Sequence, residues 1–389
     1  MRILMFSDVY FPRINGVSTS IQTFREEFLA RGHEVVLVVP DYGHAWGDDA
    51  DILRIPARRV VLDPEDRLMR GRSMRRLTAT LAARRFDLVH IQTPFVAHYA
   101  GLAMARRLGL PRVESYHTFF EEYLFHYAPL VPRTALRLAA RRFSRWQCNA
   151  MDAIAVPSTA MLEHLRAYGV VTPAEVLPTG IPAERFGRCD GTAFRARHGI
   201  PGERKVLVFI GRVAHEKNID FLLEVVATLR RRRPDVLLVI AGEGPAEGHL
   251  RGRVDALGIG ANVRFVGYLE RERELPECYC AADAFVFASR TETQGLVLLE
   301  AMALGLPVVS TAVMGTRDIL AAGRGALVPA DDVADFSAAV ERLLADPGLA
   351  ARLAQEAKEH ARQWSAGALA ERMLELYARV ISPRPAPRP

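Results

Sequence analysis

The stretch AFVFASRTETQGLVLLEAMALGLPVVST, residues 284–311, decides the fold of this chain. It begins with an apolar run, Ala284–Ala288, that is typical of a buried strand, and it continues into the polar turn Ser289–Gln294. From Gly295 onward apolar residues recur at helical spacing, until Pro307 precedes another strand-like run. The stretch therefore predicts a strand, a loop and a helix, which is the unit of a parallel sheet covered by helices.

The start of this predicted helix has the features of an anion site. Gly295 lets a ligand approach the backbone closely, and the first turn of a helix has N–H groups without intrahelical partners. These donors and the positive end of the helix dipole suit a phosphate group. Glu292 precedes the helix and Glu300 lies within it, where carboxylates can accept hydrogen bonds from ribose or hexose hydroxyls. Taken alone, two glutamates at this spacing are more often plain charges at a surface and a helix end.

The composition is that of a soluble globular protein long enough for two domains. Half of the 389 residues are hydrophobic and a quarter are charged, and no apolar run reaches the length of a membrane span. The net charge of +6 is carried almost entirely by arginine, since the lysines are Lys205, Lys217 and Lys358. A basic balance suits a nucleotide, a nucleic acid or an anionic membrane surface, and it does not choose among them.

Apolar runs and helical patterns alternate through the first half of the chain, which predicts a parallel sheet with helices on both faces. The predicted strands are Ile3–Ser7, Val35–Val39, Ile52–Ile55, Leu88–Gln92, Arg112–Tyr116 and Ala153–Pro157. Ligands of such folds bind at the carboxyl ends of the strands. The loops at these ends span residues 8–19, 93–98 and 117–127. Gly16 lies in the first loop, ahead of a helix that Ser18 or Ser20 would cap.

A boundary between two domains is predicted near residues 176–188, where prolines and glycines interrupt the pattern. The second domain opens with the strand Val206–Ile210. Arg212 and Lys217 follow in one short loop, before a helix that Asn218 would cap. Two cations in this loop can reach a diphosphate from the side opposite the anion-binding helix. The alternative is a solvated surface pair.

The stretch SRTETQGLVLLEAMALGLPVVST resembles the Glu-x7-Glu motif of retaining, sugar-nucleotide-dependent glycosyltransferases of family 4. The resemblance covers nearly the full chain, with the motifs in the family order. It implies the GT-B fold, an α/β fold of two Rossmann-like domains with parallel sheets facing across a cleft. A C-terminal helix would cross back to the N-terminal domain. The resemblance implies an acceptor-binding domain at residues 1–180 and a nucleotide-sugar-binding domain at residues 181–363. The returning helix would occupy residues 364–381, followed by a flexible tail at 382–389.

The resemblance also assigns roles to individual residues. It implies that Glu292 contacts the donor sugar, that Glu300 contacts the nucleotide ribose, and that His117 lies beside the transferred sugar. Arg212 and Lys217 would hold the diphosphate and stabilise its leaving charge. A lone histidine at a strand end is otherwise more often structural than catalytic. The expected catalytic residues are His117, Arg212, Lys217 and Glu292, and the other expected donor-binding residues are Gly16, Val266, Gly267, Leu269, Thr293, Gln294, Gly295, Leu296 and Glu300.

The segment that begins Tyr116-His117-Thr118 is similar to bacterial diacylglycerol glucosyltransferases in particular, and TETQG at 291–295 points the same way. The resemblance implies transfer of a hexose, with glucose as the expected sugar, from a UDP-sugar to a lipid such as diacylglycerol, giving an α-glycoside. The family resembles enzymes that use front-face transfer, so Glu292 is not assigned as a covalent nucleophile. The expected acceptor-binding residues are Tyr116, Glu121, Tyr123 and Tyr127.

Other functions stay open at this point. The same transfer to a soluble or another lipid-linked acceptor, a sugar-nucleotide epimerase and a non-catalytic nucleotide-sugar binder are all compatible with this architecture. No cofactor is expected beyond the UDP-sugar substrate. The stretch 237–248, LLVIAGEGPAEG, imitates a dinucleotide fingerprint, but its spacing differs and Pro245 interrupts it. No nucleic acid and no obligate protein partner is expected.

Two segments of the first half are unusually basic. Residues 52–85 hold ten arginines against three acids, and residues 131–147 hold five arginines and no acid. The spacing of Arg133, Arg137 and Arg141 places them on one face of a predicted helix that ends with Trp146. Such a helix suits the interface of an anionic membrane, and an ordinary solvated arginine face is the equal alternative.

No metal site is expected. Asp48, Asp49 and Asp51 contain a D-x-D pattern without a matching partner, which indicates a surface turn, and no His/Asp cluster accompanies the donor motifs. Metal-independent transfer is therefore expected. The N-terminus reads as a first strand rather than a signal peptide, so the expected location is the cytoplasm, with peripheral attachment to the inner face of the plasma membrane. Disulfides are not expected there among Cys148, Cys189, Cys278 and Cys280.

Overall fold

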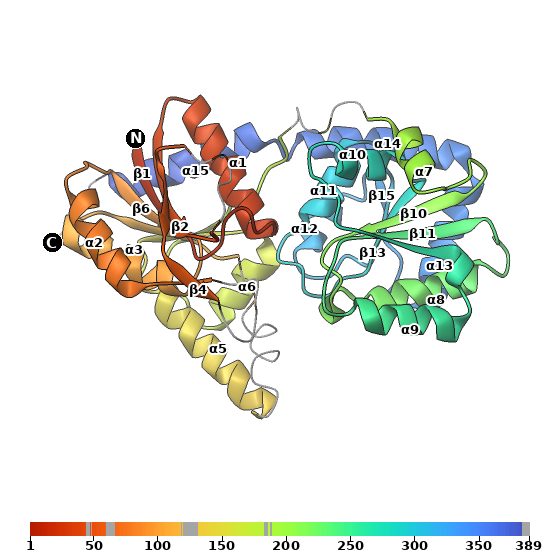
Figure 1. Cartoon of the computed structure of the whole chain (residues 1–389), viewed down its shortest axis with the longest axis horizontal. Helices are drawn as coiled ribbons and strands as arrows, with labels where there is room; N and C mark the ends of the chain where they lie inside the picture. Colours follow the sequence, from red (N-terminus) through yellow and green to blue (C-terminus); the bar gives the residue numbers. More distant parts are fainter. Residues whose placement is uncertain are drawn as a thin grey trace. The chain divides into compact units, whose positions relative to one another are not determined.

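The chain folds into two compact α/β units, seen in a computed structural model (Figure 1). Unit 1 comprises Met1–Gly180 together with Ala366–Pro389, and unit 2 comprises Ile181–Ser365. The structure describes residues 1–43, 47, 49–59, 67–117, 119, 131–182, 186 and 189–382, without the side chains of 75, 76, 78 and 79. Among these residues, no helix is both long and apolar enough to cross a bilayer.

Unit 1 is built on a seven-stranded parallel sheet of order β3-β2-β1-β6-β7-β8-β9, and a separate antiparallel ribbon pairs β4 with β5. The strands are β1 (Arg2–Phe6), β2 (Glu34–Pro40), β3 (Ile52–Ile55), β4 (Ala57–Arg59), β5 (Arg67–Met69), β6 (Leu88–Ile91), β7 (Arg112–Ser115), β8 (Ala153–Val156) and β9 (Ala174–Val176). The helices are α1 (Gly16–Ala30), α2 (Gly71–Ala82), α3 (Val96–Leu108), α5 (Arg133–Cys148), α6 (Thr159–Ala167) and α15 (Ala366–Ile381).

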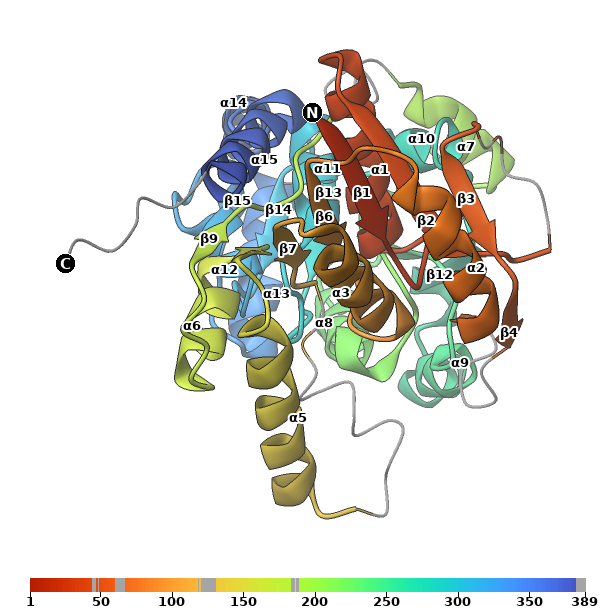
Figure 2. The same cartoon turned by 90° about the vertical axis from the view of Figure 1, so that its left-hand side faces the viewer.

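The side chains of the central strand β1 alternate between two cores. Leu4 and Phe6 join the core that includes residues of α2, α3, α5 and α6, whereas Ile3 and Met5 join the core that includes residues of α1 and α15. This alternation follows from the two-residue period of a strand, and it buries both faces of the sheet. Figure 2 shows α2 and α3 along one face of this sheet, and α5 extending away from it.

The last helix, α15, returns to unit 1 and packs beside α1 (Figure 1). Tyr377 of α15 is fully buried, and its ring meets that of Phe28 of α1 with centroids 5.7 Å apart. The helical stretch after Pro347 consists of two helices, because the first ends at Arg362 in unit 2 before α15 begins.

Unit 2 has a six-stranded parallel sheet of order β12-β11-β10-β13-β14-β15 around one hydrophobic core. Its strands are β10 (Lys205–Ile210), β11 (Val236–Ala241), β12 (Val263–Gly267), β13 (Ala284–Phe287), β14 (Val308–Ser310) and β15 (Ala326–Leu327). Its helices are α7 (Gly191–Arg197), α8 (Ile219–Leu229), α9 (Glu247–Leu257), α10 (Glu274–Cys280), α11 (Leu296–Ala303), α12 (Thr316–Leu320), α13 (Val333–Ala345) and α14 (Pro347–Arg362), with the 3-10 turns η2 (His215–Lys217) and η3 (Gly260–Asn262).

Two predicted helix caps are wrong. Asn15, not Ser18 or Ser20, caps α1: its side chain accepts hydrogen bonds from the backbone of Val17 and Ser18. Ser18 completes a capping box, because its hydroxyl oxygen accepts from the Asn15 N–H. Asn218 stands at the N-cap position of α8, but its side chain donates to the carbonyl oxygen of Ala288 instead (3.2 Å).

The expectation of reduced cysteines is wrong for one pair. Cys189 and Cys280 form a disulfide across 91 positions of sequence, between the segment before α7 and the end of α10. Helices α7 and α10 are packed against each other, and this proximity is not visible in the spacing of the cysteines. Cys148 and Cys278 are free and buried, and burial raises the pKa of both thiols above the ordinary range.

Candidate functional site

The loops that follow β10 and β13 in unit 2 lie where the strand order of the sheet reverses. Strand β10 lies between β11 and β13, so the chain winds outward from β10 in one direction and from β13 in the other. The loops that follow β10 and β13 therefore leave the same edge of the sheet side by side. This is the place where open α/β sheets bind their ligands.

The loop after β13 ends at Gly295 in a conformation that requires glycine. Its φ is 98°, and a Cβ there would lie 2.9 Å from Cγ2 of Thr316. Gly295 is the N-cap residue of α11 and gives the helix no side-chain cap. The loop is held by a hydrogen bond from the Gly315 N–H to the Glu292 carbonyl oxygen (2.9 Å). The first turn of α11 thus begins at a fixed position with backbone donors available for an anion.

Lys217 and Glu292 meet between the two loops. The Nζ of Lys217, at the end of η2, lies 2.5 Å from Oε1 of Glu292, and about a fifth of each side chain is exposed (20% and 18%). The hydrogen bond from Asn218 to Ala288 fixes the same junction. The structure therefore brings together two of the predicted catalytic residues. Arg212 lies in the same loop as Lys217, with an exposed side chain.

Glu300 is buried in α11 and is held by two residues that the sequence analysis missed. Its Oε2 accepts a hydrogen bond from the Tyr279 hydroxyl (2.9 Å), and its Oε1 accepts one from Nη2 of Arg271 (3.0 Å). Burial, together with the charge of Glu300, raises the pKa of Tyr279 well above its usual value. Each carboxylate oxygen can accept a further hydrogen bond, so the carboxylate is both fixed and able to bind a hydroxyl group.

The other predicted donor residues differ in exposure. Thr293 and Leu296 are partly exposed and Gln294 is buried. Leu269 is buried in the core of unit 2, whereas Val266 and Gly267 of β12 are partly exposed.

The glycine-rich stretch after β11 serves close packing of the backbone. A Cβ on Gly242 would lie 2.0 Å from the carbonyl oxygen of Gly211, and the Gly242 N–H donates to the Gly267 carbonyl oxygen (2.8 Å). These contacts join the loop after β11 to the loop after β10 and to β12. The close approach of the backbone therefore explains why a glycine stands at position 242 of this dinucleotide-like pattern.

In unit 1, His117 belongs to a buried hydrogen-bond network. Its Nε2 lies 3.1 Å from Oε1 of Gln92, whose Nε2 lies 3.0 Å from Nδ1 of His90. His90 in turn contacts the Ser115 hydroxyl (2.9 Å) and the Tyr377 hydroxyl (2.5 Å). Burial lowers the pKa of His117 to about 4 and that of His90 to about 3, so both imidazoles are neutral at pH 7. The role of His117 beside a sugar stays a prediction.

Asp8, at the end of β1, ties two loops of unit 1 together. Its carboxylate accepts hydrogen bonds from the Thr93 hydroxyl (2.9 Å) and from the backbone N–H groups of Phe95 (3.1 Å) and Ala97 (3.0 Å). Burial raises its pKa to about 6, although these hydrogen bonds act in the opposite direction. Gly16 follows the first of these loops as the first residue of α1.

Of the four predicted acceptor residues, Tyr116 lies within the described part of the chain. Tyr116 is buried and its hydroxyl lies 2.7 Å from the Ser144 hydroxyl, so it joins the end of β7 to α5. Glu121, Tyr123 and Tyr127 lie outside the described residues.

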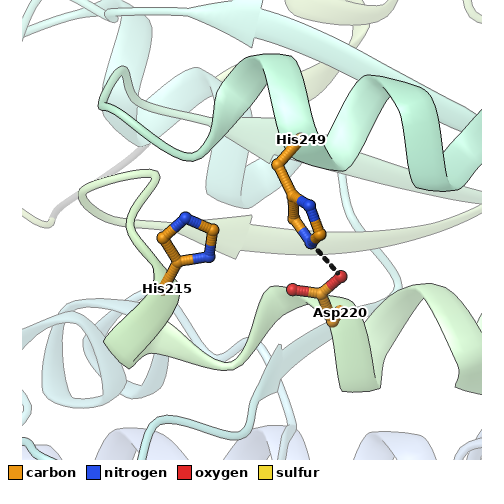
Figure 3. Close-up of side chains that lie close together, drawn as sticks. All are labelled: His215, Asp220 and His249. Atoms are coloured by element: carbon orange, nitrogen blue, oxygen red, sulfur yellow. Dashed lines mark hydrogen bonds and ion pairs between the residues drawn. The ribbon is translucent and has the colours of Figure 1, made fainter.

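The expectation that no His/Asp cluster accompanies the donor motifs is wrong. His215, Asp220 and His249 offer ligand atoms that all lie within 4.8 Å of one another, beside the loop that carries Lys217 (Figure 3). The D-x-D pattern, by contrast, is engaged with arginines: Asp49 pairs with Arg25 (2.6 Å) and Asp51 with Arg84 (3.0 Å). Asp48 lies outside the described residues.

Two family models match the chain. Glycosyltransferase Family 4 matches residues 14–185, and Glycosyl transferases group 1 matches residues 190–360. The alpha-monoglucosyldiacylglycerol synthase of Streptococcus pneumoniae is 32% identical over 318 residues, which cover 80% of this chain and 71% of that protein. The chain belongs to the family 4 glycosyltransferases. The fold class predicted from the motifs is confirmed, and the protein is a glycosyltransferase.

Other members of the family are similar to this glycosyltransferase along most of its length. The alpha-monoglucosyldiacylglycerol synthase of Acholeplasma laidlawii is 29% identical and covers 79% of this chain and 80% of its own. The GDP-mannose-dependent alpha-mannosyltransferase of Mycobacterium tuberculosis is 30% identical, with coverages of 85% and 84%. The solved structure of sucrose-phosphate synthase from Thermosynechococcus elongatus aligns with a TM-score of 0.80 at 21% identity, covering 98% and 99% of the two chains. The solved structure shares the fold of this chain, and the names of the two sequence relatives give different sugars, glucose and mannose.

Proposed function

We propose that this glycosyltransferase transfers glucose from a UDP-sugar to a lipid acceptor such as diacylglycerol, with retention of the anomeric configuration and without a metal ion. The observation that carries the proposal is the Lys217–Glu292 pair beside the glycine-started helix α11. The two relatives named alpha-monoglucosyldiacylglycerol synthase support the sugar and the acceptor.

The reaction requires stabilisation of a departing diphosphate. As the bond from the sugar C1 to the diphosphate oxygen breaks, negative charge develops on the diphosphate. The Lys217 ammonium, the Arg212 guanidinium and the backbone donors of α11 supply preorganised positive charge for it. The acceptor oxygen forms its bond on the same face of the sugar, and its proton passes to the departing phosphate.

The two glutamates have different surroundings and therefore different tasks. Glu292 is partly exposed and bonded to the Lys217 ammonium, so its second oxygen can accept from a sugar hydroxyl next to the diphosphate. Glu300 is buried and fixed by Tyr279 and Arg271, which suits a rigid acceptor for the ribose hydroxyls.

The donor is tested by thermal unfolding with UDP, GDP, UDP-glucose and GDP-mannose, followed by transfer assays with diacylglycerol in mixed vesicles. A ligand that binds the folded protein raises its melting temperature by mass action. We expect stabilisation by UDP and UDP-glucose and formation of glucosyldiacylglycerol. Stabilisation by GDP and turnover of GDP-mannose alone would contradict the proposed donor. GDP-mannose is a real alternative because one relative is a GDP-mannose-dependent mannosyltransferase.

Helix α5 offers a surface for reaching a lipid acceptor. Leu138 and Trp146 are exposed to 61% and 55%, and the Trp146 ring lies 6.0 Å from that of the exposed Tyr99. An open hollow beside them is lined by Arg142, Arg145, Trp146, Asn149 and Ala150. Exposed aromatic and basic side chains side by side suit the interface of an anionic bilayer. Phe143, by contrast, is partly buried and packs against the core of unit 1, so it is not part of this surface.

Vesicle flotation tests this surface. Each arginine near an anionic membrane contributes about 1 kcal/mol, so the double variant Arg142→Glu/Arg145→Glu is expected to lose binding to anionic vesicles at low salt. The matched control is Arg231→Glu/Arg232→Glu, which makes the same charge change at two exposed arginines of unit 2. Equal flotation of wild type and both variants would remove α5 from the proposal, and no flotation of the wild type together with transfer to a soluble acceptor would remove the lipid.

A further inference from the structure

Three side chains from different elements of unit 2 converge beside the loop that follows β10. His215 projects from η2, Asp220 from the first turn of α8, and His249 from the first turn of α9 (Figure 3). Nε2 of His249 lies 2.8 Å from Oδ1 of Asp220, and the two imidazole rings lie 5.1 Å apart with a tilt of 59°. The ligand atoms of all three lie within 4.8 Å of one another.

The ligand set fits zinc. Two imidazoles and one carboxylate are ligands that Zn²⁺ takes at about 2.0–2.2 Å, and in a tetrahedral site such ligand atoms stand about 3.3 Å apart. One observed separation, 2.8 Å between His249 and Asp220, is shorter than that value, and all of the separations fall within 4.8 Å. Harder ions such as Mg²⁺ and Ca²⁺ prefer sites made of oxygen ligands alone, so two histidines disfavour them.

The surroundings permit the small adjustment that metal binding needs. His215 and His249 are exposed, so their rings can turn without disturbing the core. Arg253 lies 3.7 Å from the Asp220 carboxylate and competes with a cation for it, but its guanidinium has a second partner in Glu224 at 3.1 Å. A metal ion can therefore take the place of the His249–Asp220 hydrogen bond while Arg253 keeps an ion pair.

We propose that His215, Asp220 and His249 form a zinc site with a fourth position open to water. The bound ion would tie η2 to α8 and α9. Because His215 stands two residues before Lys217 in η2, the ion would also restrain the turn that carries the proposed phosphate ligand. The site is separate from the donor chemistry, since no step of the proposed transfer passes through the metal. Zinc binding and sugar transfer can therefore be tested independently.

The experiment is calorimetric titration of ZnCl₂ into the untagged, metal-stripped full chain, with Co²⁺ absorption spectra as a second readout. We expect saturable binding of one zinc ion per chain, a raised melting temperature, and the intense visible bands of Co²⁺ in a tetrahedral site. His215→Gln and His249→Gln should each weaken zinc binding at least about tenfold and abolish the Co²⁺ bands, because each removes a direct ligand.

The matched control is His164→Gln, which removes an imidazole from helix α6 of unit 1, whereas the cluster belongs to unit 2. It should bind zinc as the wild type does. Absence of saturable binding to the wild type, or equal affinity in His249→Gln and the wild type, would overturn the proposal. Circular dichroism of each variant establishes that the substitutions leave the fold intact. None of these readouts uses a sugar nucleotide, so failure of the zinc site and failure of the proposed transfer remain distinguishable.

Discussion

Replacing Lys217 by methionine tests the proposed phosphate clamp most directly. Methionine keeps much of the apolar stem of lysine but removes the ammonium that lies 2.5 Å from Glu292. If the ammonium stabilises the leaving diphosphate, its loss must slow transfer. If Lys217 only pairs with Glu292, the loss must affect stability alone.

The two effects differ in size. Both side chains of the pair are about a fifth exposed (20% and 18%), so breaking it should cost about 1 kcal/mol or less of unfolding free energy. Removing one preorganised donor from a developing anion typically costs about 3 kcal/mol, which corresponds to about a 150-fold loss of rate. A Lys217→Met variant should therefore unfold near the wild-type midpoint and yet be about 100-fold slower.

The assay is the initial rate of sugar transfer at saturating donor, with urea unfolding in parallel. Lys205 supplies the control, because it lies at the opposite end of β10 and is also ion-paired, with Asp283 at 3.1 Å. Lys205→Met removes the same charge and should keep kcat within about threefold of the wild type, a change of less than 1 kcal/mol. A folded Lys217→Met variant with the same kcat as Lys205→Met would refute the clamp.

Three further predictions concern the glutamates, metal removal and a buried histidine. Glu300→Gln should weaken binding of UDP by about tenfold or more, measured by calorimetry, because it removes a charged acceptor for the ribose hydroxyls. Glu292→Gln should bind UDP nearly as the wild type does and lose transfer. Equal losses of UDP affinity in the two variants would contradict their separate tasks. Transfer should persist in excess EDTA, which also empties the proposed zinc site, and a manganese-reversible loss of activity would show the metal-free mechanism to be wrong. Since burial lowers the pKa of His90 to about 3, the folded protein binds fewer protons than the unfolded chain between about pH 6.5 and 3, so stability is lost as the pH falls through this range. His90→Gln should remove up to about 1.4 kcal/mol of this loss per pH unit, measured as urea unfolding at pH 7 and pH 5, and identical pH slopes would argue against a neutral buried His90.

Local patterns in the sequence determined the framework of the site. The strand–loop–helix pattern at 284–311 and the loop with Arg212 and Lys217 were predicted because strand and helix periods act over only a few neighbouring residues. The carboxyl ends of parallel strands share one edge of a sheet, and the two loops were predicted to approach a bound diphosphate from opposite sides. The position of Gly295 also followed from the sequence, and its positive φ gives the physical reason.

Contacts between distant segments were decided by the tertiary structure alone. Tyr279 and Arg271 reach Glu300 from 21 and 29 positions away, and no periodicity links them to it. The disulfide between Cys189 and Cys280 spans 91 positions for the same reason. Such contacts depend on which helices pack together. A helical or strand pattern in the sequence is compatible with many different packing partners, so it does not predict these contacts.

The polar network around His90 and the His/Asp cluster show the same difference between elements, which the sequence predicted, and contacts, which packing decided. Tyr377 contacts His90 across 287 positions because α15 returns to unit 1, and the family resemblance implied that return but not the contact. Asp220 and His249 meet only because α8 and α9 pack side by side with their first turns at the same end. Sequence periodicity predicted the elements and the edge of the sheet at which the loops gather, since these depend on short-range spacing. Packing decided which side chains meet at this edge, because distant segments of the chain come together only when the chain folds.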